Sequence, residues 1–320
     1  MASKRVFRDT DEHFQSALIW ATAATIVAAL VVAAALGSGL RVSFAGRGSV
    51  LAGAIIGGSA VAGAISRGFA PRVATALGSF SILTFAGATA GVLSMVGQMF
   101  AYPLIDDSLA AADELIGIQT IDVVRFVVEL PGGSHMLAML YELSVPLVFL
   151  SALALSLLGR HERVWELCAG FSFCLLVATT VSFLLPAVGA FEHSGIGLAF
   201  GSRLPGGSGV YHLKNFYALR GASEILIDPM HPKGLVTFPS FHTAMALMTA
   251  AAWRTDSYLR GPMIVWNSGV ILSTLPIGGH YVVDLLGGAA IWLLVFRFGT
   301  AWRGALRSAG SFRFSRPQPA

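Results

Sequence analysis

Charged residues are scarce in this sequence. They make up 12% of the 320 residues, whereas hydrophobic residues make up 55% and the mean hydropathy is +0.72. A soluble globular domain carries about a quarter charged residues. The chain therefore lacks the polar side chains that would cover a water-facing surface of ordinary size, and its composition predicts a polytopic membrane protein. The basic residues fall in short clusters between apolar stretches, which fits membrane topology rather than nucleic-acid binding.

Cysteine and linker sequence are also scarce. Cys168 and Cys174 lie in one apolar stretch and are too few for a zinc cage, so we interpret them as buried small apolar side chains. His193, His212 and His231 have an irregular spacing that forms no metal pattern. No Pro/Ser-rich linker or long charge run divides the chain, which favours a single membrane domain.

Long apolar runs, in contrast, are abundant. A membrane-spanning helix needs about 20 mostly apolar residues. The candidate segments are 14–40, 48–66, 73–105, 136–159, 167–191, 234–253, 261–279 and 281–296. The sequence therefore predicts an all-α polytopic membrane protein with about eight transmembrane helices.

The distribution of charge predicts the orientation of these helices. If Lys4, Arg5 and Arg8 are cytoplasmic, most other basic clusters, including the C-terminal arginines, fall on the same side, as the positive-inside rule requires. Both termini are therefore expected in the cytoplasm. The acidic segment 106–133 is expected outside, where "IDVVRFVVEL" predicts a short helix lying on the membrane. The Ala/Gly-rich composition, with more Arg than Lys, is compatible with a bacterial inner membrane.

Three ionisable residues converge at the outer end of this predicted topology. His242, in "FPSFHTA", lies near the outer end of one candidate span, and His280 and Asp284, in "GGHYVVDLLGG", lie near that of another. An intramembrane aspartate is costly unless paired, so Asp284 marks a candidate functional site. Residues four apart on a helix share a face, so Asp284 can hold the His280 ring and raise its basicity. His242 can then act as the complementary acid.

These residues resemble a known family. "PSFH" and the pattern S-T-x5-H-x3-D, formed by Ser273, Thr274, His280 and Asp284, resemble the second and third motifs of the type 2 phosphatidic acid phosphatase (PAP2) superfamily, PSGH and SRxxxxxHxxxD. "FPSFHTA … GGHYVVDLLGG" and "YPLIDDSLAAADELIG" look more like its branch of inositol phosphorylceramide synthases, the Aur1-type inositolphosphotransferases.

The resemblance implies a domain organisation. It covers roughly residues 75 to 300, so 73–300 is expected to form a catalytic membrane domain with a six-helix PAP2-like core. Residues 1–72 would add a cytoplasmic tail and two further helices, and 301–320 a basic cytoplasmic tail.

The resemblance also implies a chemistry. His280 would attack phosphorus and form a phosphohistidine, Asp284 would orient its ring, and His242 would protonate the leaving alkoxide and then activate the acceptor. Ser240 and Ser273, with main-chain amides near Ser240, would donate to the phosphoryl oxygens. The substrates would be a phospholipid donor and a lipid alcohol or water, and no metal or other cofactor is required.

The sequence departs from the family pattern in its basic residues. The first motif, KxxxxxxRP, is missing, because "KNFYALR" is one residue too short and lacks the proline, and Thr274 and Phe241 replace an arginine and a glycine. A phosphodiester carries one charge and needs fewer cationic contacts than a phosphomonoester, so these losses favour a phosphodiester donor. Arg220 and Lys233 are the remaining candidates for phosphate binding.

Three classes of function follow. The first is a lipid phosphotransferase that moves a phosphoalcohol headgroup at the outer membrane face. The second is a hydrolase of a lipid phosphate or polyprenyl pyrophosphate that uses the same residues. The third is a non-enzymatic transporter with a His/Asp proton relay, which the clustering of polar residues at one end disfavours.

Overall fold

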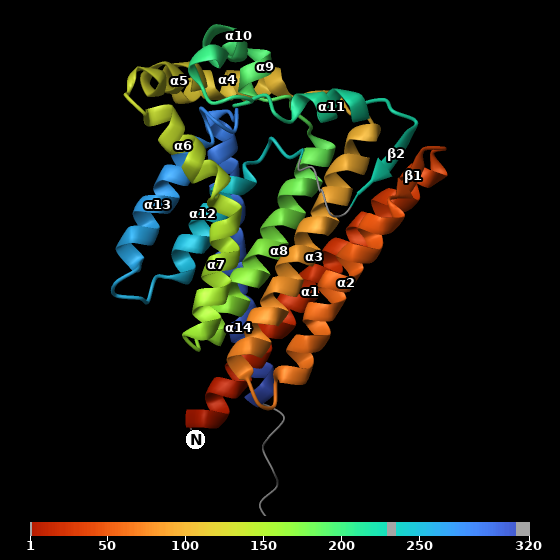
Figure 1. Cartoon of the computed structure of the whole chain (residues 1–320), viewed down its shortest axis with the longest axis vertical. Helices are drawn as coiled ribbons and strands as arrows, with labels where there is room; N and C mark the ends of the chain where they lie inside the picture. Colours follow the sequence, from red (N-terminus) through yellow and green to blue (C-terminus); the bar gives the residue numbers. More distant parts are fainter. Residues whose placement is uncertain (1, 229–234, 312–320) are drawn as a thin grey trace, which may run out of the picture.

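The computed structural model describes residues 2–228 and 235–311 and is mostly α-helical. Long helices run side by side as a bundle, and short helices with two strands cover one end of it (Figure 1). We call this end the capped end. The helical prediction holds for the bundle, whereas the small sheet in the cap was not expected.

The bundle helices correspond to the predicted apolar segments. They are α1 (Ala2–Gly37), α2 (Gly46–Ser66), α3 (Pro71–Met99), α6 (Gly133–Glu142), α7 (Ser144–Leu157), α8 (His161–Leu184), α12 (Phe241–Ala252), α13 (Arg260–Ser273) and α14 (Val282–Ser311). Helix α14 continues into the segment predicted as a C-terminal tail.

Three helices of the described chain, α2, α3 and α8, are long and apolar enough to cross a membrane. A fourth span results if α5 (Thr120–Glu129) and α6, which are bent by 117°, are counted together. Shorter apolar helical stretches are Ala21–Gly37, Ser144–Leu157 and Phe241–Ala252. The membrane character of the chain is thus supported, and the number of eight spans stays a prediction.

The segment 136–159 is not the single helix that its hydropathy suggested. It is divided at Leu143 into α6 and α7. Pro146 explains the division, because a proline has no N–H to donate to the carbonyl four residues earlier, at Glu142, and its ring crowds that carbonyl. The break leaves Tyr141 in the last turn of α6, which matters for the site.

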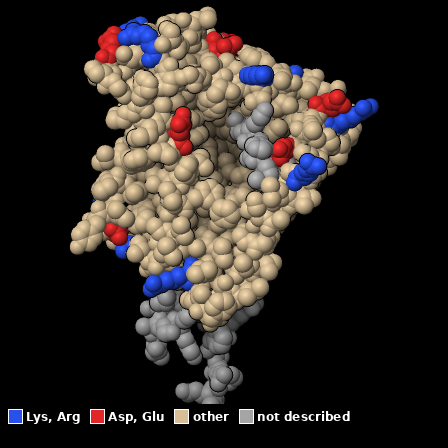
Figure 2. All heavy atoms as spheres, viewed as in Figure 1, with Lys and Arg blue, Asp and Glu red and all other residues tan. Residues whose placement is uncertain are grey.

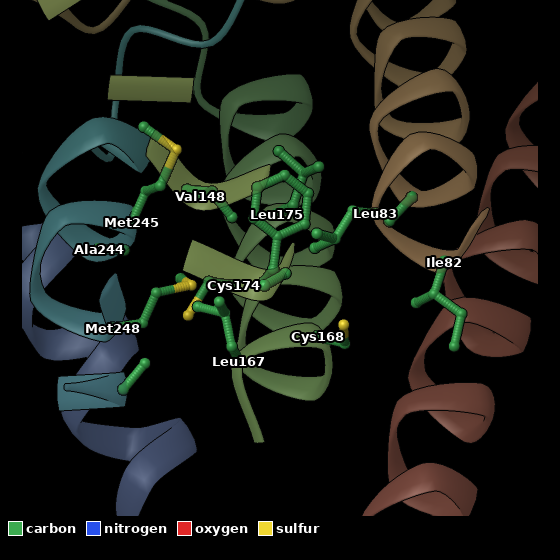
Figure 3. Close-up of a cluster of buried hydrophobic side chains, with 14 of the residues drawn as sticks. Ile82, Leu83, Val148, Leu167, Cys168, Cys174, Leu175, Ala244, Met245 and Met248 are labelled. Atoms are coloured by element: carbon green, nitrogen blue, oxygen red, sulfur yellow. The ribbon is translucent and has the colours of Figure 1, made fainter. Parts of the chain in front are cut away.

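The core of the bundle lies where α3, α7, α8 and α12 meet. Met245 and Met248 of α12 belong to the same buried cluster as Leu167 and Leu175 of α8, and Figure 3 shows Met248 beside Leu167. The two cysteines belong to this core and are fully buried and free, as predicted: they are Cys168 and Cys174. On the surface, a broad band without Lys, Arg, Asp or Glu crosses the middle of the bundle in the view of Figure 2, as expected for a lipid-facing belt.

The cap is built from segments that are far apart in sequence. Its helices are α4 (Asp106–Ile116), α5, α9 (Ala190–His193), α10 (Ile196–Phe200), a 3₁₀ turn (Gly201–Arg203) and α11 (Leu213–Leu219). Strands β1 (Arg41–Phe44) and β2 (Glu224–Ile227) pair in parallel, with Arg41 opposite Glu224. Helix α5 is the short helix predicted from "IDVVRFVVEL". The strands are four residues each, too short to give a periodic signal.

Candidate active site

His280 and Asp284 lie at the start of α14, at the capped end of the bundle. Nδ1 of His280 is 2.9 Å from Oδ2 of Asp284, and the backbone N–H of Tyr281 donates to the same oxygen at 3.0 Å. The two side chains are 4% and 0% exposed. With the carboxylate ionised, Nδ1 of His280 carries the proton, so the lone pair of Nε2 lies on the opposite side of the ring.

The expected contact is present, but the helix-face argument behind it was wrong. Helix α14 begins at Val282, so His280 precedes it. Gly279, at φ +78°, turns the chain immediately before the histidine. The Asp284 side chain reaches back over the first turn, where helix N–H groups have no partner inside the helix, and there it meets both Tyr281 N–H and the His280 ring.

The start of α12 lies against this pair. Ser240 is the N-cap of α12, and its hydroxyl oxygen accepts from the backbone N–H of Thr243 at 3.4 Å and from the Thr243 hydroxyl at 3.2 Å. The same oxygen is 3.5 Å from Nε2 of His280. The backbone N–H of Ser240 donates to the carbonyl oxygen of Asp284 at 3.0 Å, which joins the two helix starts directly.

Two glycines allow this close approach. A Cβ at Gly288 would collide with the carbonyl oxygen of Ser240, and one at Gly287 would lie 2.9 Å from Cβ of Pro239. The glycine pair of "DLLGG" therefore permits tight packing of α14 against the chain that leads into α12.

His242 approaches the same place from another side. It is the second residue of α12, and its ring stacks on Tyr141 with 4.4 Å between centroids and 24° between planes. A Cβ at Gly278 would lie 3.0 Å from Cδ2 of His280 and 3.1 Å from Cε2 of Tyr141. Since His280 and Tyr141 both flank Gly278, and Tyr141 stacks on His242, the structure gathers all three candidate catalytic residues at one place.

Asp113 of α4 supports the start of α14. Asp113 accepts hydrogen bonds from the backbone N–H groups of Val282 and Val283, both at 2.8 Å. Burial raises the pKa of Asp113, and these two hydrogen bonds oppose the rise. The carboxylate occupies the usual place of a helix cap, although it comes from a distant part of the chain.

Asp106 performs a similar role for the turn before α9. It accepts from the N–H groups of Val188 at 2.9 Å and Gly189 at 3.0 Å, and from the hydroxyl of Tyr281 at 3.1 Å. Asp106 is 3% exposed. It thus ties the residue that follows His280 to the 187–189 turn.

A further part of the site comes from residues 205–212, which the sequence pattern did not resolve. The N–H of Gly209 donates to the carbonyl of Ile277 at 2.7 Å, and a Cβ at Gly279 would lie 2.6 Å from the carbonyl oxygen of Gly209. These two contacts hold the segment so that Tyr211 lies beside Tyr141, with 2.8 Å between their hydroxyl oxygens.

His212 is buried beside Tyr211. Its Nε2 lies 2.9 Å from the carbonyl oxygen of Val188, so this nitrogen carries the proton and donates. Burial is the main cause that lowers the pKa of His212, and the hydrogen bond to Val188 opposes this shift. His212 is therefore neutral at neutral pH and acts as a hydrogen-bond donor within the cap.

The phosphate-binding candidates differ in their placement. Ser240 faces His280, as described above. Ser273 is fully buried and donates its hydroxyl to the carbonyl of Val270 at 2.7 Å. Arg220 donates through Nη2 to the carbonyls of Ala101 and Tyr102, at 3.4 and 2.8 Å. Lys233, like His231, lies outside the described residues.

Two buried polar atoms in this region have no hydrogen-bond partner in the described part of the chain. One is Oδ1 of Asp284, and the other is Nη1 of Arg220. The Asp284 oxygen leaves acceptor capacity next to His280. The Arg220 nitrogen leaves one donor of a guanidinium that is otherwise held by carbonyls and stacked over Phe216 at 5.4 Å.

Sequence reasoning missed Tyr211 and His212 as parts of this site, and included Asp106 and Asp113 only within a stretch that resembles the family. The aspartates stand seven residues apart in α4, a spacing that places both on one helix face. That periodicity was available in the sequence, but the acidic residues were interpreted through membrane topology and the family resemblance and not through their spacing. No comparable signal marks Tyr211, because its position depends on the contact between Gly209 and Ile277.

The structure is thus a bundle of apolar helices with a buried His–Asp pair and a second histidine at its capped end. A family model of the PAP2 superfamily matches residues 107–298, more than half of the chain. The protein belongs to the PAP2 superfamily, whose members are generally phosphatases or phosphotransferases of lipid phosphoesters. No curated protein and no solved structure gives a match.

Proposed function

We propose that this protein is a membrane-embedded phosphotransferase of the Aur1 type, which moves a phosphoalcohol headgroup between lipids through a phosphohistidine at His280. The observation that carries the proposal is the orientation of His280. Its Nδ1 is bound to Asp284, and its Nε2 lies 3.5 Å from the hydroxyl of Ser240 at the start of α12. A nucleophilic nitrogen whose tautomer is fixed by Asp284, and which lies beside the hydroxyl at the start of α12, suits attack on phosphorus.

The reaction has two matched halves. In the first, the lone pair of His280 Nε2 forms the N–P bond, the P–O bond to the leaving alcohol breaks, and His242 gives its proton to that oxygen. In the second, His242 takes the proton of the acceptor hydroxyl, the new O–P bond forms, and the N–P electron pair returns to Nε2. Asp284 keeps the proton on Nδ1 throughout.

The start of α12 supplies donors for the phosphoryl oxygens. The helix begins at Phe241, so the N–H groups of Phe241 and His242 have no acceptor four residues earlier within the helix. A helix N-terminus favours bound anions through these N–H groups and its dipole. The Ser240 hydroxyl adjoins them. Ser273 contributes here only if its hydroxyl turns away from Val270.

A phosphodiester suits these donors better than a phosphomonoester. The third-motif arginine is replaced by Thr274, whose hydroxyl donates to the carbonyl of Ile271 at 2.6 Å. Arg220 is engaged with two carbonyls through Nη2, and its Nη1 has no partner among the described residues. Neutral N–H and O–H donors are sufficient for one negative charge, whereas a dianion rewards several cations. The capped end is assigned to the extracytoplasmic face, as the distribution of basic residues favours.

The test uses purified protein in detergent with headgroup-labelled phosphatidylinositol and either ceramide or diacylglycerol. A parallel assay measures phosphate released from phosphatidic acid. We expect a new headgroup-bearing lipid and an acid-labile label on the protein, both lost in His280→Ala. The matched control is His135→Ala, which changes an exposed histidine of α6.

Other outcomes would contradict the proposal. Phosphate release alone, lost in His280→Ala, would make the protein a hydrolase. Full activity in His280→Ala would remove the histidine from the mechanism altogether.

A further inference from the structure

The hydroxyl pair of Tyr141 and Tyr211 is a polar feature beside His242 that the reaction scheme leaves unused. The two oxygens are 2.8 Å apart, and Tyr141 is stacked on the His242 ring. Tyr141 comes from the last turn of α6, and Tyr211 from the cap segment seated on Ile277. Tyr211 is 53% exposed, whereas His280 is buried, so the pair lies on the more open side of the site.

The pair has one proton to spare. Each phenol carries one O–H donor, and a hydrogen bond between two phenols uses only one of the two protons. The tyrosine that accepts therefore still has its own O–H for a third group. No other partner of either hydroxyl is found in the described residues. A donor is thus available where His242 would exchange a proton with the leaving or entering oxygen.

The position of Tyr211 is fixed by its backbone. Gly209 donates to the carbonyl of Ile277 at 2.7 Å, and its own carbonyl approaches Gly279, the residue before His280. The segment that carries Tyr211 is therefore held against the loop that carries the nucleophile. The hydroxyl pair and the reacting nitrogen share this support, so their separation is set by the fold.

Resting on the function proposed above, we infer that the Tyr141–Tyr211 pair holds the oxygen of the lipid alcohol against His242 and so favours an alcohol over water as acceptor. The spare phenolic O–H donates to a lone pair of the alcohol oxygen. The alcohol's own O–H points to His242, which takes this proton as the O–P bond forms and the N–P bond to His280 breaks. Water can occupy the same place, but it has no chain to keep it there.

The experiment measures how the phosphohistidine divides between alcohol and water. Wild-type protein receives headgroup-labelled phosphatidylinositol and increasing dioctanoylglycerol, and the ratio of labelled lipid product to released headgroup phosphate is followed. The variants are Tyr141→Phe, Tyr211→Phe and the double change, which keep both rings and remove only oxygens. Tyr217→Phe is the matched control, because Tyr217 lies in the adjoining helix α11 and donates its hydroxyl to Glu192 instead.

We expect each single variant to lower the alcohol-to-water ratio about 3- to 10-fold, as the loss of one hydrogen bond allows. Because the two hydroxyls act together, the double variant should fall by less than the product of the two single effects. Formation of the phosphohistidine should change less than the ratio.

The inference is overturned if the ratio is unchanged, if both products fall in equal proportion, or if the single effects simply add. It is also overturned if wild-type protein forms only the water product at every alcohol concentration. In these cases a persisting label on His280 keeps the proposed phosphohistidine chemistry. Absence of that label in wild-type protein would instead contradict the proposed function, and the inference would fall with it.

Discussion

His280 is held by hydrogen bonds from buried groups, whereas His242 is held by one aromatic ring that reaches towards the surface. The His280 ring is bound to Asp284. Helix α4 fixes the chain that follows, because the Asp113 carboxylate accepts from the N–H groups of Val282 and Val283. The His242 ring stacks on Tyr141, and that tyrosine is joined to the exposed Tyr211. His280 is thus fixed by buried contacts, whereas His242 lies on the more exposed side of the site.

The difference matches the two tasks that the proposed double displacement gives to these histidines. A nucleophile attacks and is released along one direction, so a fixed ring and a fixed tautomer help it. A shared acid and base must serve two different oxygens, one leaving and one entering, so it needs access from outside. The comparison predicts that changes to the frame of His280 cost more than changes around His242.

The largest effect is expected for Asp284→Asn. An amide keeps the shape but favours the wrong tautomer of His280, and the equivalent change in a serine-protease triad lowers kcat about 10⁴-fold. We expect a loss on the order of 10³- to 10⁴-fold in headgroup transfer, measured with labelled phosphatidylinositol in detergent. Asp122→Asn is the control, because that carboxylate is exposed on α5. A loss below tenfold would show that the His–Asp pair is not central.

Asp106 and Asp107 offer a second test within one motif. Asp106 is buried and accepts three hydrogen bonds, whereas the side chain of Asp107 is fully exposed. Asp106→Asn places an NH₂ group against N–H donors and should destabilise the fold by about 1–3 kcal/mol. The apparent melting temperature in detergent should fall for Asp106→Asn and stay unchanged for Asp107→Asn. If both variants had the same melting temperature, α4 would not contribute to holding the chain around His280.

These two aspartates also show what the sequence could predict. Residue type and spacing singled out His242, His280 and Asp284 as candidates, because histidines and an aspartate are rare in apolar helices and the rarity itself is informative. The buried position of Asp106 beside an exposed Asp107 could not be predicted, since it depends on which face of α4 meets the chain at Val188. Local sequence carries no record of that distant partner.

In the cap, too, the sequence predicts single elements but not how distant segments are placed relative to each other. Helix α5 was expected from its own residues, but β1 and β2 pair across most of the chain, and neither has enough residues to form a pattern. The break between α6 and α7 was foreseeable from Pro146. Its consequence was not, because stacking of Tyr141 on His242 requires α6 and α12 to be placed relative to each other.

Gly279→Ala tests the contact between the two sides of the site. Gly279 has φ +78°, and an added Cβ would lie 2.6 Å from the carbonyl oxygen of Gly209. The left-handed conformation alone costs about 1–2 kcal/mol for a residue with a Cβ. We expect lower thermal stability and a lower alcohol-to-water ratio, because the seat of Tyr211 shifts. Gly261→Ala, with open space around it, should change neither quantity. An unchanged ratio in Gly279→Ala would separate the cap segment from acceptor binding.

The smallest effect is expected for the pH dependence that His212 contributes. Its pKa is lowered in the folded protein, mainly by burial, with His280, Asp106 and Glu192 as the nearby titratable groups. The unfolded chain, with a histidine pKa of about 6.5, therefore binds more protons than the folded chain below that pH. The stability due to neutral His212 is complete above this value and is lost as the pH falls through it. His212→Gln keeps a donor for Val188 but does not titrate, so its melting temperature should fall less than that of wild-type protein between pH 7 and about 5. Parallel curves for the two proteins would mean that His212 does not titrate with unfolding, and that the cap draws its acid sensitivity from other groups.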